Sequence, residues 1–261
     1  MTTSVKQAVR DFWDAEPCGT RDVELEEGTP EFFARLESER NDREPFIADF
    51  AYFTEHRGKR ILEVGVGAGT DFVRFARAGA IATGVDLTHH GVELTRQRLA
   101  LEGLEADVLE ADAEALPFEE DTFDFVYSWG VVHHTEHPEE AAREILRVTR
   151  PGGRICVMVY HRWSLVGLQS WLVHGLARGR PSRTLREVIW HYHESLGTQA
   201  YTIPEALALF DGLATRRVTP VVTPYDVRIT RTRFLPRWVQ TIIPRRWGWF
   251  LVIEGRKGSP T

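Results

Sequence analysis

Three glycines at alternate positions follow a short apolar run in "ILEVGVGAGTDF", residues 61–72, and this turn constrains the fold more than any other stretch. A glycine-rich turn between a strand and a helix lets the backbone approach a nucleotide closely. The turn also begins a regular alternation of strand-like and helix-like segments. Such an alternation predicts an α/β fold, a mostly parallel sheet with helices on both faces.

Four regions follow from this pattern. We predict that residues 57–161 form the core. Its strands are expected at 60–66, 81–87, 106–112, 123–130 and 155–161. Its helices are expected at 69–79, 90–103 and 137–149. Residues 1–56 predict an N-terminal helical lid, with helices at 2–15 and at 30–56, the latter broken near Pro45. Residues 162–215 predict a helical insertion after strand five, above the carboxyl ends of the strands on the acceptor side. Residues 216–261 predict final strands near 216–223 and 247–257 that complete the sheet, the last one antiparallel.

The residues around the glycines indicate which nucleotide fits. A phosphate loop of the ATP-binding type needs a lysine after the glycines, and none is present. A dinucleotide fingerprint places a third glycine where Thr70 stands. Glu63, two positions before the first glycine, would repel a pyrophosphate and suits an ammonium or sulfonium cation. An NAD-dependent oxidoreductase therefore remains only the weaker alternative.

Two further acidic residues follow the next two strands. Asp86 ends the second strand in "GVDL", where a carboxylate can accept hydrogen bonds from ribose hydroxyls. Asp112 ends the third strand in "EADAEALPF", where a carboxylate can accept a hydrogen bond from an adenine amino group. Together with Glu63, these acids match S-adenosylmethionine (SAM) better than NAD.

The same stretches resemble the class I SAM-dependent methyltransferases, in particular the small-molecule branch that includes the ubiquinone/menaquinone-type enzymes. The resemblance covers about residues 60–161 and rests on "LEVGVGAGT", "GVDL" and "DAEALPFEEDTFDFVYSWGVVHHTEHPEEAAREILRVTRPGGRICVMVY". It implies a Rossmann-like sheet of seven strands with the last strand antiparallel. It also implies that SAM, the one cofactor expected, lies across the carboxyl ends of strands one to four.

The resemblance assigns the SAM-binding residues by position. They are Glu63, Gly65, Gly67 and Gly69 in the first motif, Asp86 and Leu87 at the ribose, Asp112 and Ala113 at the adenine, and Ser128, Trp129 and Gly130 where the methionine moiety and the acceptor meet. In this branch, segments before the first strand often fold over the cofactor. Trp13 is therefore a further candidate, and Arg40 and Tyr52 are weaker ones.

Methyl transfer requires orientation and exclusion of water, and a general base only when the acceptor must lose a proton. The candidates for catalysis or acceptor contact are His133, Tyr160 and His161, although each histidine could equally serve the fold. Only one of His191 and His193 can point inward, because they are two positions apart.

Composition narrows the class of protein and of acceptor. Residues 1–140 carry 31 acidic and 13 basic side chains, and residues 141–261 carry 7 and 19. The basic half could attract an anionic substrate or a surface, or the two halves could pair within one globule. Two cysteines provide neither a disulfide framework nor a thiolate metal site, and we expect no metal. No run approaches the ~18 apolar residues of a spanning helix, so a cytoplasmic protein without integral membrane association is expected.

The sequence therefore predicts a methyltransferase acting on a small organic acceptor, possibly anionic or lipid-like, and not on nucleic acid, because "SWGV" replaces the motif of base-methylating enzymes. A SAM-binding partner subunit without its own catalysis is the alternative. Residues 231–250 mix arginine with tryptophan and could lie on a membrane surface or bind the acceptor, or could simply form a packed linker helix. The oligomeric state stays open.

Overall fold

The computed structural model describes residues 4–228, 234–236 and 238–258, so part of the 231–250 segment lies outside the described residues. A seven-stranded sheet forms the centre, in the order β3-β2-β1-β4-β5-β7-β6. Its strands are β1 (Arg60–Val64), β2 (Ile81–Asp86), β3 (Asp107–Glu110), β4 (Phe123–Trp129), β5 (Thr149–Tyr160), β6 (Leu213–Val221) and β7 (Phe250–Lys257). Strand β7 runs antiparallel to both of its neighbours. The predicted Rossmann-like class is confirmed.

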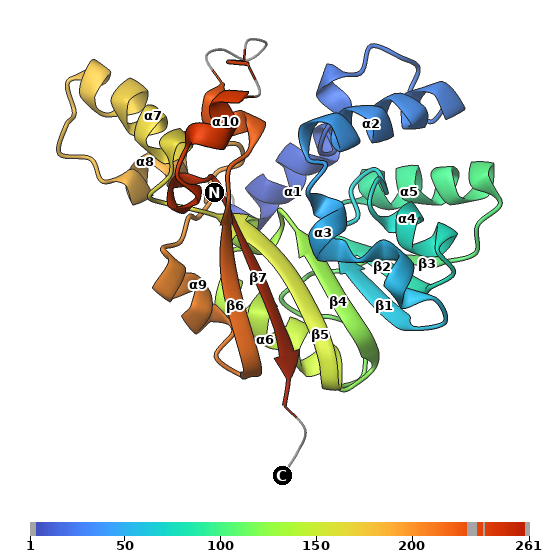
Figure 1. Cartoon of the computed structure of the whole chain (residues 1–261). Coiled ribbons are helices and arrows are strands. Elements are labelled where there is room, and N and C mark those ends of the chain that lie inside the picture. Colours follow the sequence, from blue (N-terminus) through green and yellow to red (C-terminus); the bar gives the residue numbers. More distant parts are fainter. Residues whose placement is uncertain (1–3, 229–233, 237, 259–261) are drawn as a thin grey trace.

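The α-helices fall into three groups along the chain (Figure 1). The N-terminal group is α1 (Val5–Ala15), α2 (Pro30–Arg43) and α3 (Ile47–Ala51). The core group is α4 (Phe72–Arg77), α5 (His89–Glu102) and α6 (Pro138–Val148). The later group is α7 (Leu165–His174), α8 (Leu185–Tyr192), α9 (Ile203–Leu209) and α10 (Trp238–Ile242). Short 3₁₀ turns include η3 (Val132–His134), η5 (Pro224–Val227) and η6 (Arg245–Trp247).

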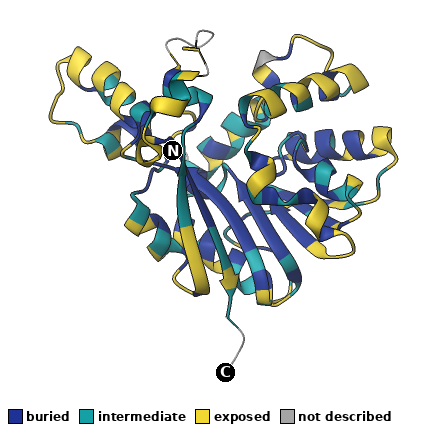
Figure 2. Cartoon of the chain, viewed as in Figure 1, coloured by how far each residue is buried: buried dark blue, intermediate teal, exposed yellow. Residues whose placement is uncertain are grey.

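Two apolar layers cover the sheet, and its central strands β1, β4, β5 and β7 are the most deeply buried (Figure 2). Side chains alternate between the two faces of a strand, so each strand supplies both layers. On β4, Phe125 and Tyr127 pack with α3, α4 and α5, whereas Val126 packs with α6 and α9. All three side chains are at most 1% exposed. The sheet is therefore a rigid platform for whatever lies at its edge.

Two segments differ from the sequence-based expectation. Strand β5 begins at Thr149 rather than Ile155, because Thr149 pairs with Phe123 before a bulge, and Gly152 turns there with a φ of +72°. Helix α9 packs against α6, β6 and β7 instead of lying above the carboxyl edge. Only the earlier part of residues 162–215 therefore occupies the predicted place.

The carboxyl ends of the parallel strands point toward a layer of helices from the N-terminal group and from the later group. Helices α1 and α2 cover one side of this edge, and α7, α8 and α10 cover the other (Figure 1). Every ligand motif predicted above follows a strand at this edge, where open α/β sheets bind their ligands. In the described residues, no helix is long and apolar enough to cross a bilayer.

Candidate functional site

A cavity of about 700 Å³ lies at the carboxyl edge. The turns after β1, β2, β3 and β4 form its floor, and side chains of α1, α2 and α7 form its walls. Of the predicted cofactor residues, ten line it: Trp13, Glu63, Gly65, Gly67, Asp86, Leu87, Asp112, Ala113, Trp129 and Gly130. Segments far apart in the sequence thus converge on one space.

The glycines of the first turn serve two purposes. Gly65, Gly67 and Gly69 all have positive φ values, of 84°, 52° and 72°, which L side chains rarely adopt. A Cβ at Gly67 would meet nothing within 4 Å, so the turn leaves open space beside the cavity there. A Cβ at Gly65 would lie 2.1 Å from Val131, and one at Gly69 would lie 2.9 Å from the Thr95 hydroxyl. Gly69 does not line the cavity and is required for packing.

Glu63, at the end of β1, is a buried carboxyl facing the cavity. It is 4% exposed, and its Oε2 has no hydrogen-bond partner among the described residues. Burial, together with the neighbouring Asp71 carboxylate, raises the pKa of Glu63 well above its ordinary value. A buried carboxyl without a partner is costly unless a cation binds it. Glu63 therefore fits the ammonium group of an amino-acid ligand.

Asp86, at the end of β2, is held by the turn it faces. Its Oδ2 accepts a hydrogen bond from the Gly67 amide at 2.8 Å, and its Oδ1 accepts from the amide and hydroxyl of Thr88 at 2.9 and 2.7 Å. Burial raises the pKa of Asp86, although these hydrogen bonds oppose the shift. Each carboxylate oxygen can accept further hydrogen bonds. The carboxylate is thus preorganised for a diol, as the ribose assignment requires.

Asp112, after β3, is paired with the N-terminal helix. Lys6 of α1 lies 2.7 Å from Oδ2 of Asp112 and 2.7 Å from Oε2 of Glu114. Farther along α1, Asp14 accepts a hydrogen bond from the His90 amide at 3.0 Å. Trp13 meets His134 edge to face, with the ring centroids 5.2 Å apart. Helix α1 therefore closes the cavity over the motif residues, as a lid would.

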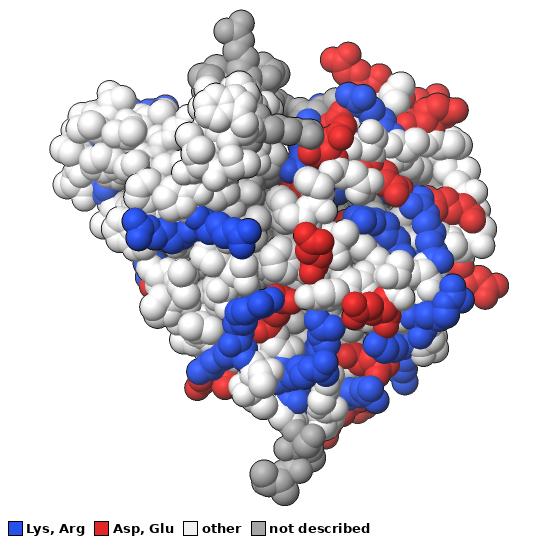
Figure 3. All heavy atoms as spheres, viewed as in Figure 1, with Lys and Arg blue, Asp and Glu red and all other residues white. Residues whose placement is uncertain are grey.

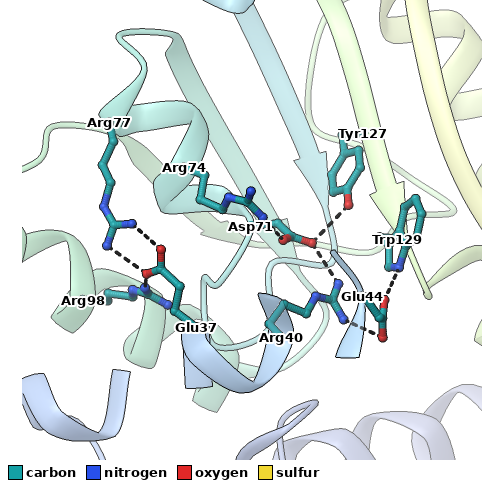
Figure 4. A network of polar contacts seen from close by, with 9 residues as sticks. All are labelled: Glu37, Arg40, Glu44, Asp71, Arg74, Arg77, Arg98, Tyr127 and Trp129. Carbon is teal, nitrogen blue, oxygen red and sulfur yellow. Dashed lines mark hydrogen bonds and ion pairs between the residues drawn. The ribbon is translucent and has the colours of Figure 1, made fainter. Parts of the chain in front are cut away.

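Helix α2 joins this roof to the floor through a buried network of charges (Figure 4). Arg40 lies 2.8 Å from Oδ2 of Asp71 and 3.4 Å from Oε1 of Glu44. The hydroxyl of Tyr127 also donates to Asp71, at 3.1 Å. The two carboxylates are only 3% and 4% exposed, so Arg40 supplies the cation that compensates them. Sequence reasoning gave Arg40 too little weight, because its partner Asp71 lies 31 residues farther along the chain.

Aromatic side chains form the end of the cavity next to β4. Glu44 accepts hydrogen bonds from the Trp129 indole and from the Tyr225 hydroxyl, both at 3.0 Å. Trp249 and Phe250, at the start of β7, line the same end, and both rings stack against Tyr160. Trp129 and Phe250 themselves meet edge to face. This end, which we call the aromatic chamber, consists of Trp129, Tyr160, Tyr225, Trp249 and Phe250.

Glu194, just after α8, places a charge in the aromatic chamber. Its Oε2 accepts a hydrogen bond from the Tyr160 hydroxyl at 2.8 Å and lies 3.2 Å from Nε2 of His134. Desolvation opposes ionisation although the Glu194 side chain is still 36% exposed, and these partners with the nearby His193 outweigh it and lower the pKa of Glu194 to about 2. Its φ of +55° is strained for a non-glycine residue. Backbone strain and a perturbed pKa at the same residue are both typical of functional sites.

His134 is held by contacts on both sides of its ring. Its Nδ1 lies 3.0 Å from the Ser195 hydroxyl and 3.1 Å from that of Thr198. Because Glu194 remains ionised, the Nε2 that faces it must carry the proton of their hydrogen bond. His134 thus joins the turn after β4 to the segment after α8.

The three predicted catalytic residues differ in their position relative to the cavity. Tyr160 lines the aromatic chamber, whereas His133 and His161 do not line the cavity. His133 is 0% exposed, and burial lowers its pKa well below the ordinary value. His161 hydrogen-bonds through Nδ1 to the Gly248 carbonyl at 3.0 Å and faces the other side of β5, because side chains alternate along a strand. Because neither lines the cavity, their assignment as catalytic residues stays a prediction without support from this geometry.

Other candidates are sorted in the same way. Ser128 is 0% exposed and does not line the cavity, so the cofactor role assigned to it stays a prediction without support from this geometry. Of the spaced histidines, His193 lines the cavity and His191 is exposed. Tyr52 donates to Glu254 on the sheet, away from the cavity. Glu194 was missed, because a lone glutamate after a helix carries no motif.

Comparison with known proteins agrees with this geometry. A family model described as a methyltransferase domain matches residues 62–157. An uncharacterised protein of Mycobacterium tuberculosis is 37% identical over 126 residues, which are 48% of this chain and 44% of that protein. Methyltransferase GfsG of Streptomyces halstedii is 32% identical over 135 residues, 50% of this chain and 49% of that protein. The chain spans about half the length of these curated relatives.

A solved structure extends the likeness in fold. The S-adenosylmethionine-dependent methyltransferase from Mesorhizobium loti superposes with a TM-score of 0.59 at 20% identity, over 80% of this chain and 98% of the other. The ubiquinone/menaquinone-type branch stays a prediction. Over residues 62–157 the chain is therefore similar to a methyltransferase domain, and its sheet shares the fold of this solved SAM-dependent methyltransferase.

Proposed function

We propose that this protein transfers the methyl group of SAM to a small organic acceptor that carries a hydroxyl or amino group. One observation carries the proposal. A single cavity joins the turns of the SAM motif to the aromatic chamber, in which Glu194 offers a hydrogen-bond acceptor. Donor and acceptor can therefore meet in one enclosed space, which is what an in-line transfer needs.

The residues at the floor of the cavity suit SAM in chemistry. Glu63 would hold the ammonium group, Asp86 the ribose hydroxyls and Asp112 the adenine amino group, with Lys6 moving from its ion pair on Asp112. When bound, SAM supplies an activated methyl group on a sulfonium sulfur. The protein's own task is then to orient the two reactants and to exclude water.

The aromatic chamber fits an acceptor with an apolar body. The rings present few polar atoms to the cavity. An apolar or lipid-like acceptor therefore displaces water with the loss of few hydrogen bonds. Glu44 and Glu194 are carboxylates within it, and they disfavour an acceptor whose anionic group lies next to them. A hydroxyl or amino group beside Glu194 would instead donate a hydrogen bond to it.

Glu194 and His134 are also placed to orient the acceptor. The acceptor's O–H or N–H would donate to Glu194, which orients the lone pair of the attacking atom. His134 donates to the same carboxylate through Nε2. A carboxyl whose pKa is about 2 is too weak a base to keep the proton, so we assign to this pair the orientation of the acceptor and not the abstraction of its proton.

The test is transfer of label from methyl-labelled SAM to a panel of phenols, alcohols, amines and amphipathic lipids. We expect label in a low-molecular-mass product of one class, and no product with an Asp86→Ala variant. Binding of SAM without transfer to any class would favour the partner-subunit alternative. Label confined to protein or nucleic acid would contradict the proposed acceptor class.

A further inference from the structure

Exposed apolar side chains gather on one part of the surface. Among the described residues, sixteen large apolar side chains are exposed. Four of them lie on or near α2, β2, α5 and β3, and the rest lie on the later helices and turns. The other twelve are Trp163, Leu168, Leu172, Val173, Leu176, Tyr192, Leu196, Phe234, Leu235, Trp238, Ile242 and Trp247. We call these twelve the apolar face. Trp163, Trp238 and Ile242 are 62%, 64% and 68% exposed, which is more than a monomer ordinarily tolerates for a cluster.

The two segments that carry the apolar face adjoin in space. Helices α7 and α10 both pack against η5 and stand together above the sheet (Figure 1). A second hollow, of about 660 Å³, is lined by Trp163 and Leu168 from the α7 side and by Arg246 and Trp247 from η6. The apolar face is therefore one surface with a groove in it, not a set of scattered residues.

The charges around this face have a single sign. From Arg162 to Arg186 the sequence holds five arginines and no acidic residue, and from Val227 to Ile253 it holds six and none. Figure 3 shows the lobe of α7 and α8 as white with blue at its rim, whereas red and blue mix over the core. In the described part of the chain, no ion pair joins a carboxylate to any of Arg178, Arg180, Arg186, Arg245 and Arg246.

Arginine and tryptophan are also in contact here. Arg246 lies over the Trp247 ring at 5.5 Å, and Arg178 lies over the Tyr192 ring at 5.5 Å. Exposed tryptophan and aliphatic side chains, bordered by arginine without acidic partners, are typical of surfaces that enter the headgroup region of a bilayer. Unpaired arginine is attracted to anionic lipid headgroups. In contrast, a symmetric dimer through this face would bring like charges together.

The apolar face also borders the entrance to the catalytic cavity. Val173 is 49% exposed and lines that cavity as well, together with Gln169, Ser170 and His174 of the same helix. We propose that the apolar face docks onto the surface of an anionic lipid bilayer. A bilayer held there would lie next to the aromatic chamber and could deliver an amphipathic acceptor. This inference goes beyond methyl transfer, and its test does not depend on catalysis.

Co-sedimentation with vesicles tests the proposal. Vesicles of phosphatidylcholine alone are compared with vesicles that also contain phosphatidylglycerol, at low and high salt. We expect binding to the mixed vesicles that salt weakens. Replacing Trp163 and Ile242 together by serine should lower the partition coefficient about tenfold. The matched control replaces Ile81 and Leu101 by serine, because both are exposed (60% and 53%) outside the apolar face.

A second pair of variants separates charge from apolar contact. The double variant Arg245→Gln/Arg246→Gln should lower the partition coefficient on the mixed vesicles by about fivefold for each arginine replaced. Its binding to pure phosphatidylcholine should be unchanged. Circular dichroism and thermal melting confirm that the variants are folded. The proposal is overturned if wild-type protein binds neither vesicle, or if the Trp163/Ile242 variant binds like the control. A dimer in sedimentation equilibrium that the same variant dissociates would also overturn it, because the face would then be a subunit interface.

Discussion

The hydroxyl of Tyr160, at the end of β5, donates a hydrogen bond to Oε2 of Glu194, just beyond α8, over 2.8 Å. This contact joins the sheet to the helical segment that follows it. Because the same carboxylate reaches His134 after β4, three separate parts of the chain fix one charge in the aromatic chamber. The aromatic chamber, where we propose that the acceptor binds, is therefore fixed by contacts between distant parts of the chain.

Replacing Glu194 by glutamine keeps the size of the side chain and removes its charge. We expect kcat/KM for the acceptor to fall about 100-fold, because the charged hydrogen bond that orients the acceptor is lost. Calorimetry should give an unchanged Kd for SAM, and the exposed Glu120→Gln serves as the control. A weaker affinity for SAM with unchanged turnover would place Glu194 at the wrong end of the cavity.

The same variant has a predicted pH dependence. The pKa of Glu194 is lowered to about 2, below its unfolded value near 4.3, so its carboxylate stabilises the fold above that unfolded value. This contribution is lost as the pH falls toward 2. The difference in Tm between wild type and Glu194→Gln should therefore be largest at neutral pH and shrink between about pH 5 and pH 2. A difference independent of pH would contradict the assigned ionisation.

Glu63→Gln should affect stability and ligand binding in opposite directions. The raised pKa of Glu63 means that the buried carboxylate destabilises the free protein at pH values above its folded pKa, and the cost disappears below its unfolded pKa. The variant should therefore have a higher Tm than wild type at pH 8 and a smaller advantage in acid. It should also bind SAM about tenfold more weakly, since the partner of the ammonium group is lost. Glu105→Gln, at an exposed site, should change neither quantity.

How far the sequence predicted this fold depends on where the contacts lie. The strand–helix alternation and the turns "GVGAG" and "GVDL" are local, so β1 to β4 and the SAM end could be placed from residue types alone. Sequence reasoning offered both Tyr160 and His161 as candidates, although neighbouring side chains on a strand face opposite sides. The acceptor end could not be placed, because Glu194 and Tyr225 reach it from loops whose paths depend on tertiary packing. Sequence reasoning chose His133, whereas His134 lines the cavity; both lie in the short turn η3, where no periodicity shows which side chain faces inward.

Arg40→Met tests the charge network between α2 and the cavity floor. Removing Arg40 leaves Glu44 without its cation and Asp71 with only Arg74, 3.7 Å away, and we expect the free energy of unfolding to fall by about 3 kcal/mol. Arg35→Met is the matched control in the same helix, because Arg35 is 59% exposed and pairs with Glu39. Denaturant unfolding should show a loss of only about 0.5 kcal/mol or less there. Equal losses in the two variants would mean that the network contributes no more than a surface pair.

Asp86→Ala tests the ribose assignment. We expect SAM binding to weaken by about 1.5–3 kcal/mol, from the loss of hydrogen bonds to a charged acceptor. Asp107→Ala is the control, because Asp107 is exposed at the opposite end of the neighbouring strand β3. Calorimetry on both variants, with thermal melting to confirm folding, gives the comparison. An unchanged affinity in Asp86→Ala would mean that the ribose lies elsewhere.

The most direct measurement is calorimetric titration of the wild-type chain with SAM, with its demethylated product and with NAD. The cavity floor, with Glu63 at one end and Asp112 at the other, predicts saturable one-to-one binding of SAM and of its demethylated product, and no binding of NAD. Binding of NAD without binding of SAM would contradict the account.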